Sequence, residues 1–145
     1  MKYPIGIQSF ETLRKGGFVY VDKTDLVYKM VQGHIYFLAR PRRFGKSLLV
    51  STLKAYFEGR KDLFEGLKMM ELETEWTKYP VISFDFNGVT NMPSSLRDYL
   101  NQVIRETEAK YHLPCFETED IPLRFRTLIP RLHEVTGQQV VVLID

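Results

Sequence analysis

The feature that most constrains the fold is a change of periodicity in the first half of the chain. The stretch "HIYFLA" (34–39) is a continuous apolar run of strand length, typical of strands that a parallel sheet buries on both faces. Beyond an arginine-rich loop, apolar residues recur at helical spacing at Leu49, Leu53 and Tyr56, and Gly59 supplies a stop signal. The sequence therefore predicts a strand, a loop and a helix in that order.

The loop between this strand and this helix reads "RPRRFGKS". A loop that links a strand to a helix start presents backbone N–H groups and the positive end of the helix to an anion. In that setting Gly45 allows close approach of the backbone, Lys46 reaches the β- and γ-phosphates of a nucleotide, and the Ser47 hydroxyl coordinates Mg²⁺. The predicted nucleotide-binding residues are Arg40, Arg42, Arg43, Phe44, Gly45, Lys46, Ser47 and Leu48.

Arg40 stands where the pattern G-x-x-x-x-G-K-S has its first glycine, and a residue with a Cβ resists positive φ. The loop must therefore open differently, and Pro41 stiffens its entry. Arg42 and Arg43 either point at the nucleotide, as bidentate phosphate ligands or an arginine finger in cis, or face solvent or a partner. We favour one arginine facing inward. The competing interpretation is a basic turn without a ligand.

The rest of the chain alternates between strand and helix patterns. The predicted elements are a short strand at 18–21, a helix after Asp22 that Gly33 ends, a short helical segment near 63–67, a buried strand at 81–86, an amphipathic helix at 94–111, a helix near 121–137 that Pro130 is expected to kink or break, and a buried strand in "QQVVVLID". Strands separated by helices predict parallel βαβ units, so the fold class is α/β, with a parallel sheet flanked by helices.

Two aspartates end apolar strands. We prefer Asp145 over Asp85 as a metal residue because its strand, "VVVLI", is the more uniformly apolar, and we interpret Asp85 as structural. Ser47 and Asp145 are therefore the predicted Mg²⁺ residues. Because the sequence stops at Asp145 without a following loop or helix, we expect an interrupted domain, with residues 1–33 as an N-terminal strand and helix segment and 34–145 as an incomplete nucleotide-binding core.

The composition limits the binding partners and the cellular compartment that we expect. The net charge of +2 is too small to indicate nucleic acid or a membrane as a bulk electrostatic partner, whereas the arginine-rich loop favours a local anion. The single cysteine, Cys115, offers neither a disulfide nor a zinc site, which suits a reducing compartment. The N-terminus lacks an apolar signal core and the longest apolar run is far too short to span a bilayer, so a cytoplasmic protein is expected.

Several strings together resemble the bacterial AAA-ATPase-like proteins. They are "YVDKT" (20–24), "FLARPRRFGKSLLVSTLKAYFEG" (37–59), "LFEGL" (63–67), "YPVISFDF" (79–86) and "VVVLID". In that family the loop is spelled RPRRFGKS, so the missing glycine is a family trait. The resemblance covers nearly the whole chain and implies an ATP- and Mg²⁺-binding P-loop domain of the ASCE type, similar to archaeal-type AAA and STAND ATPases.

The resemblance also implies that this sequence lacks part of what ATP hydrolysis requires. The strand that carries the metal aspartate normally continues with a glutamate that serves as base, whereas this sequence stops at Asp145, so hydrolysis by this chain is expected to be impaired. Full-length relatives often continue into a PD-(D/E)XK nuclease-like domain, and we do not infer nuclease activity for this chain from the resemblance. Two alternatives stay open: a non-hydrolysing, nucleotide-gated module that binds a protein partner, and a DNA-associated module that uses the arginine-rich loop.

In the ASCE arrangement a later strand lies between the loop strand and the aspartate strand. We therefore expect either a gap beside "HIYFLA" or a direct pairing of that strand with "VVVLI". Asp22 and Thr24 are interpreted as a helix start and Trp76 as a core residue. Tyr20 is interpreted as a core or strand-pair residue, with stacking on adenine as the alternative.

Overall fold

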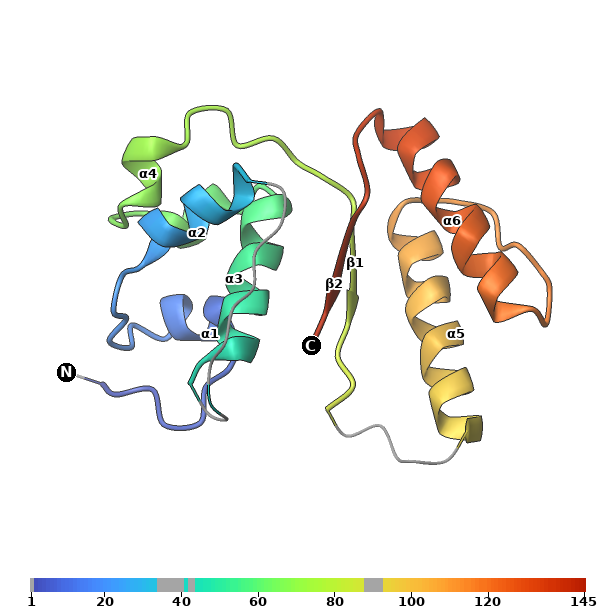
Figure 1. Ribbon diagram of the computed structural model, residues 1–145, viewed down its shortest axis with the longest axis horizontal. Helices are drawn as coiled ribbons and strands as arrows, with labels where there is room; N and C mark the ends of the chain where they lie inside the picture. The colour runs from blue at the N-terminus through green and yellow to red at the C-terminus, as the bar shows by residue number, and fades with distance from the viewer. Residues whose placement is uncertain (1, 34–40, 42–43, 88–92) are drawn as a thin grey trace. The chain divides into compact units, whose positions relative to one another are not determined.

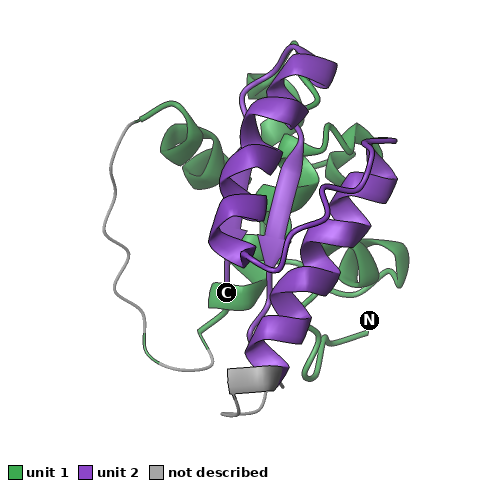
Figure 2. Ribbon diagram, turned by 90° about the vertical axis from the view of Figure 1, so that its right-hand side faces the viewer, with its two compact units in different colours: residues 1–78 green, residues 79–145 purple. Residues whose placement is uncertain are grey.

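Two groups of helices and strands, each with its own core, make up the chain (Figure 2). The computed structural model describes residues 2–33, 41, 44–87 and 93–145. Unit 1 comprises Met1–Lys78 and unit 2 comprises Tyr79–Asp145, and each is described by itself. The predicted strand at 34–39, and with it the expected gap or pairing beside that strand, lies outside the described residues.

Unit 1 is helical. Its elements are α1 (Phe10–Lys15), α2 (Thr24–Val31), α3 (Lys46–Phe57), the 3₁₀ helix η1 (Lys61–Phe64) and α4 (Met69–Leu72) (Figure 1). The aromatic ring of Phe10 packs against Tyr20 and Phe64 at centroid distances of 5.4 and 4.9 Å. Trp76 contacts Phe64 and Tyr56, which confirms its interpretation, and that of Tyr20, as core residues. An aromatic cluster therefore holds the short helices together.

The end of α3 follows the sequence signal at Gly59. This glycine has φ of 68°, the left-handed region that favours glycine. Its N–H donates to the carbonyl of Tyr56 at 2.9 Å, and the N–H of Arg60 donates to the carbonyl of Ala55 at 3.0 Å. This pair of bonds is a Schellman motif, so the predicted helix stop is confirmed.

Unit 2 contains the parallel sheet. Strands β1 (Val81–Phe84) and β2 (Val141–Ile144) pair in parallel, with Val81 opposite Val141 and Phe84 opposite Ile144. Helices α5 (Pro93–Lys110) and α6 (Ile121–Thr136) connect the strands and lie on one side of the sheet (Figure 1). The core of this unit consists of Ile82, Phe84, Val103, Ile104, Leu128 and Leu132. The prediction of helices and a parallel sheet is confirmed as a mixed fold, with two strands in the sheet among the described residues.

The structure corrects the predictions for α6 and β2. Pro130 is expected to kink or break α6, and the break does not occur, because the helix runs without interruption to Thr136. A proline inside a helix removes one hydrogen bond, but Leu128 and Leu132 on either side are fully buried, and this packing holds the helix together. The strand β2 is not buried on both faces, because Val142 and Ile144 are exposed, Ile144 by 64%.

The short strand predicted at 18–21 is also wrong. Phe18 forms only an isolated bridge with Lys2, and the Val19 N–H donates to the Lys2 carbonyl at 2.8 Å. Val21 is 73% exposed. The alternating pattern has no further strand to pair with among the described residues, so the segment continues as a connection into α2. Among those residues, no helix combines the length and the apolar character that a bilayer span requires.

Candidate functional site

The candidate site lies at the start of α3. The residue before this helix, Gly45, has φ of 75°, which a residue with a Cβ rarely adopts. The Leu49 N–H donates to the Gly45 carbonyl at 3.0 Å, so the glycine is already part of the first turn. No side chain of the described residues caps this helix end, and its first turn carries no acidic residue. Within the described residues, no acidic side chain of the first turn competes with an anion for this positive helix end.

A pocket of about 540 Å³ opens at this helix start. One side, here called the loop wall, consists of Gly45, Lys46, Ser47 and Leu48. The other side, here called the N-terminal wall, consists of Pro4, Gly6, Ile7 and Gln8. This volume falls in the range of small-molecule sites in proteins. The pocket thus joins the described part of the predicted loop to a segment about forty residues earlier in the chain.

Helix α1 fixes the two walls relative to each other. The backbone N–H of Phe10 donates to the Oγ of Ser51 in α3 at 2.8 Å. Ser9 caps α1 by accepting a hydrogen bond from the Thr12 N–H at 3.2 Å. Ser51 lies one helical turn after Ser47, so the contact anchors α1 close to the start of α3. The N-terminal wall immediately precedes this anchor.

A second pocket adjoins the first one. It has a volume of about 580 Å³ and shares Pro4, Gly45 and Leu48 with the first pocket, and its lining is mostly apolar. Tyr20 lines it from the core side. The pKa of its hydroxyl is raised, because the effect of burial exceeds the opposing effect of a hydrogen bond with the Thr52 side chain. The site therefore has a polar part at Lys46 and an apolar part beside it.

The structure brings together five of the predicted residues, from Phe44 to Leu48, at this helix start. Arg40, Arg42 and Arg43 lie outside the described residues. The N-terminal wall was missed by sequence reasoning. Its Pro and Gly indicate a turn, but no pattern in "PIGIQ" indicates a ligand. Only the packing of α1 on α3 reveals its position.

The two predicted Mg²⁺ residues lie in different units. Ser47 belongs to the loop wall in unit 1, and Asp145 follows β2 in unit 2, where its N–H donates to the Phe84 carbonyl at 2.9 Å. Among the described residues, no group of three or more His, Cys, Asp or Glu side chains is gathered as a metal site. A Mg²⁺ held by a serine, phosphates and waters needs no such group.

Asp85 makes structural contacts. Its carboxylate accepts a hydrogen bond from the Asn87 N–H at 2.8 Å. Its own N–H donates to the Tyr99 hydroxyl at 2.6 Å. These bonds tie the end of β1 to the following turn and to α5, in agreement with the structural interpretation of this aspartate.

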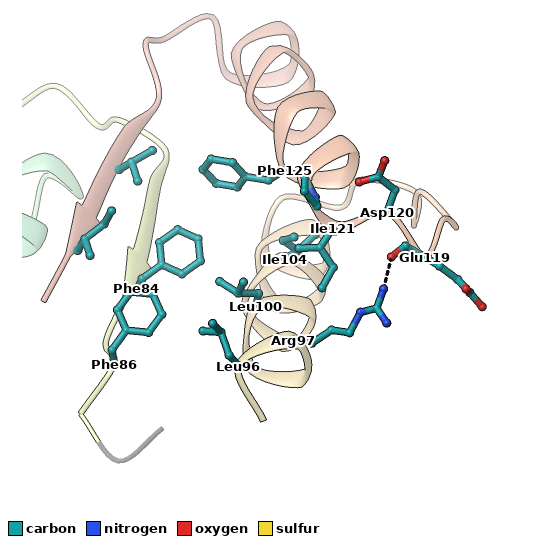
Figure 3. Close-up of a pocket in the computed structure, with 13 residues that line it drawn as sticks. Phe84, Phe86, Leu96, Arg97, Leu100, Ile104, Glu119, Asp120, Ile121 and Phe125 are labelled. Atoms are coloured by element: carbon teal, nitrogen blue, oxygen red, sulfur yellow. Dashed lines mark hydrogen bonds between the residues drawn. The ribbon is translucent and has the colours of Figure 1, made fainter. Parts of the chain in front are cut away.

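Unit 2 has a large apolar pocket of a different character (Figure 3). It has a volume of about 1160 Å³, and the residues that β1, β2, α5 and α6 contribute to it are almost all apolar. Arg97 lies at its rim and donates to the Glu119 carbonyl at 3.3 Å. The lining lacks the serine and lysine pair of the loop wall, so unit 1 holds the better candidate for phosphate chemistry.

Comparisons with known proteins show the family of the chain. The model of a family described as predicted AAA-ATPase matches residues 4–145. An uncharacterized protein encoded in the vnfD 5′ region of Azotobacter chroococcum mcd 1 is 38% identical over 148 residues. That alignment covers 99% of this chain but only 28% of the relative, and no solved structure matches. The chain belongs to the predicted AAA-ATPase family.

Proposed function

We propose that the protein binds Mg-ATP at the start of α3, as a P-loop domain of the ASCE type within a longer AAA-like ATPase. The observation that carries this proposal is the position of Gly45, Lys46 and Ser47 at a helix start that no described side chain caps and that opens into a pocket. Membership of the predicted AAA-ATPase family supports it. A helix start of this kind attracts phosphate through its N–H groups and its dipole.

Three residues of the loop wall have a role in this proposal. Lys46 lines the pocket, and in the proposal its ammonium neutralises the β- and γ-phosphates, while the Ser47 hydroxyl is the protein ligand of Mg²⁺. Gly45 holds the left-handed backbone that starts the helix. Asp145 is proposed to hold the metal through water, and one of the loop arginines to face the phosphates. Bound Mg²⁺ would neutralise phosphate charge.

Hydrolysis and its biological use are proposed for the whole protein. The chain spans 28% of the Azotobacter relative, so partners and turnover depend on segments beyond this alignment. Binding of ATP, by contrast, depends on residues that unit 1 itself brings together. Binding is therefore the step to test first.

An equilibrium titration of the full chain with ATP tests the proposal. Saturable binding that needs Mg²⁺ is expected for the unmodified protein and for Lys54→Ala, which removes an exposed lysine from the same helix. Lys46→Ala should lose most of the affinity, because it removes the cation from the loop wall. A wild-type protein that binds double-stranded DNA but no ATP, or an unchanged Lys46→Ala, would contradict the proposal.

A further inference from the structure

The N-terminal wall faces the loop wall across the polar pocket, and the proposed function gives it no role. Among the four residues of this wall, Gln8 alone has a side chain that can form hydrogen bonds. Gln8 is exposed, and its amide makes no hydrogen bond with the described residues. Ile5, in the same segment but not on the pocket, is 92% exposed. The wall therefore presents one polar side chain toward the space where the phosphates are proposed to bind.

The backbone of the same wall is also available. Within the described part of the chain, the N–H groups of Gly6, Ile7 and Gln8 donate no hydrogen bond, whereas the N–H of Ile5 donates to the Tyr3 carbonyl. Gly6 has φ of 72°, and a Cβ built there would meet nothing within 4 Å. The glycine thus serves a left-handed turn, not close packing. The turn leaves successive N–H groups without an acceptor among the described residues, beside Lys46 and Ser47.

We propose that the N-terminal wall is the second half of the ATP site, with the Gln8 amide and the neighbouring N–H groups donating to the phosphate chain opposite Lys46. This inference rests on the proposed function and adds a binding residue to it. An amide is suited to this position, because it donates two N–H bonds without placing a further charge against the phosphates. Helix α1 supplies the rigidity, since the Phe10 to Ser51 bond holds the wall at the start of α3.

The test compares Gln8→Ala and Gln8→Glu in the full chain. A hydrogen bond to a charged group contributes enough for Gln8→Ala to weaken ATP binding about ten-fold. Gln8→Glu keeps the size of the side chain but adds a negative charge, so it should weaken ATP binding further, and added salt should lessen that extra loss. Gln32→Ala and Gln32→Glu, at an exposed position beyond α2 that does not line the pocket, serve as matched controls with unchanged affinity.

Hydrogen exchange gives a readout that does not depend on the Gln8 variants. Saturating Mg-ATP should slow exchange of the N–H groups of Gly6, Ile7 and Gln8 in the unmodified protein, and should not do so in Lys46→Ala. Circular dichroism of each variant without nucleotide checks that it is folded.

The outcomes separate the two proposals. If both Gln8 variants bind ATP within two-fold of the unmodified protein while Lys46→Ala loses binding, the loop site stands and the role of the N-terminal wall is overturned. Exchange at residues 6–8 that is the same with and without ATP would overturn it as well. If the unmodified protein shows no saturable ATP binding, the proposed function itself fails, and this inference fails with it.

Discussion

The Oγ1 atom of Thr24 accepts a hydrogen bond from the backbone N–H of Met69 at 3.1 Å, and both residues are fully buried. The same hydroxyl donates to Oδ1 of Asp22 at 2.7 Å, and Oδ2 of Asp22 accepts from the Lys68 N–H at 2.8 Å. Two residues of "YVDKT" thus join the start of α2 to the start of α4, 45 positions further along the chain. We call this arrangement the Asp22–Thr24 clamp.

Thr24→Val should destabilise unit 1. Valine has the same shape as threonine but leaves the buried Met69 N–H without an acceptor, which costs about 1–3 kcal/mol. Trp76 is the single tryptophan and packs against Phe64 in the core of unit 1, so its fluorescence during urea unfolding reports on this unit. Thr24→Ser retains the hydroxyl and is the control. A valine variant as stable as the serine variant would disprove the role of this bond.

Asp22→Asn should flatten the acid dependence of stability. Burial raises the pKa of the Asp22 carboxyl, but hydrogen bonds from the Lys68 N–H and from Thr24 outweigh it, and the net pKa lies below the ordinary 3.8. A carboxyl with a lowered folded-state pKa contributes stability above its unfolded pKa, and this contribution is lost as the pH falls through the folded value. The unfolding free energy of unit 1, followed by Trp76 fluorescence, should therefore decline less steeply below about pH 4 in the variant. Parallel curves for the two proteins would contradict this assignment.

The clamp also shows what sequence can and cannot predict. Asp22 and Thr24 were predicted as a helix start from their residue types, and α2 does begin at Thr24. Their bonds to Lys68 and Met69 could not be predicted, because no local pattern specifies which distant N–H groups a side chain meets. The same distinction applies to the candidate site. The loop wall is local and follows from strand, loop and helix signals, whereas the N-terminal wall depends on how α1 packs on α3.

The errors have a related cause. Alternation at 18–21 predicted a strand, but a strand forms only where a neighbour pairs with it, and the described residues supply one bridge at Phe18. Pro130 favours a kink or a break in its helix, but the helix continues to Thr136, because burial of Leu128 and Leu132 outweighs the loss of one hydrogen bond. In both places tertiary contacts override the local preference.

A buried ion cluster holds α5 and α6 together in unit 2. Oε2 of Glu108 lies 3.0 Å from Nη2 of Arg124, and Oε1 lies 3.0 Å from Nη1 of Arg131. The side chains of Glu108 and Arg124 are each only 4% exposed. Glu108 also accepts the Phe116 N–H at 3.2 Å, which ties the loop between the helices to the cluster. The Glu108 carboxylate therefore neutralises the charge of the buried Arg124 guanidinium and holds the loop between α5 and α6.

Glu108→Gln should destabilise unit 2 strongly. The change leaves the buried charge of Arg124 without its partner, which costs about 3–5 kcal/mol. Glu106→Gln removes an exposed carboxyl from the same helix and should stay within about 0.5 kcal/mol of the unmodified protein. Hydrogen exchange of α5 and α6 measures both effects within this unit. Equal protection in the two variants would show that the cluster is not needed for stability.

Thermal unfolding with and without Mg-ATP, followed by Trp76 fluorescence, tests the central claim most directly. At an ATP concentration of 100 times Kd, binding to the folded state should stabilise the unmodified protein by about 2.7 kcal/mol and raise its Tm. Lys54→Ala should show the same rise, and Lys46→Ala should show none, because Lys46 lies on the loop wall and Lys54 does not. A rise of equal size in Lys46→Ala, or no rise in the folded unmodified protein, would contradict an ATP site at the start of α3.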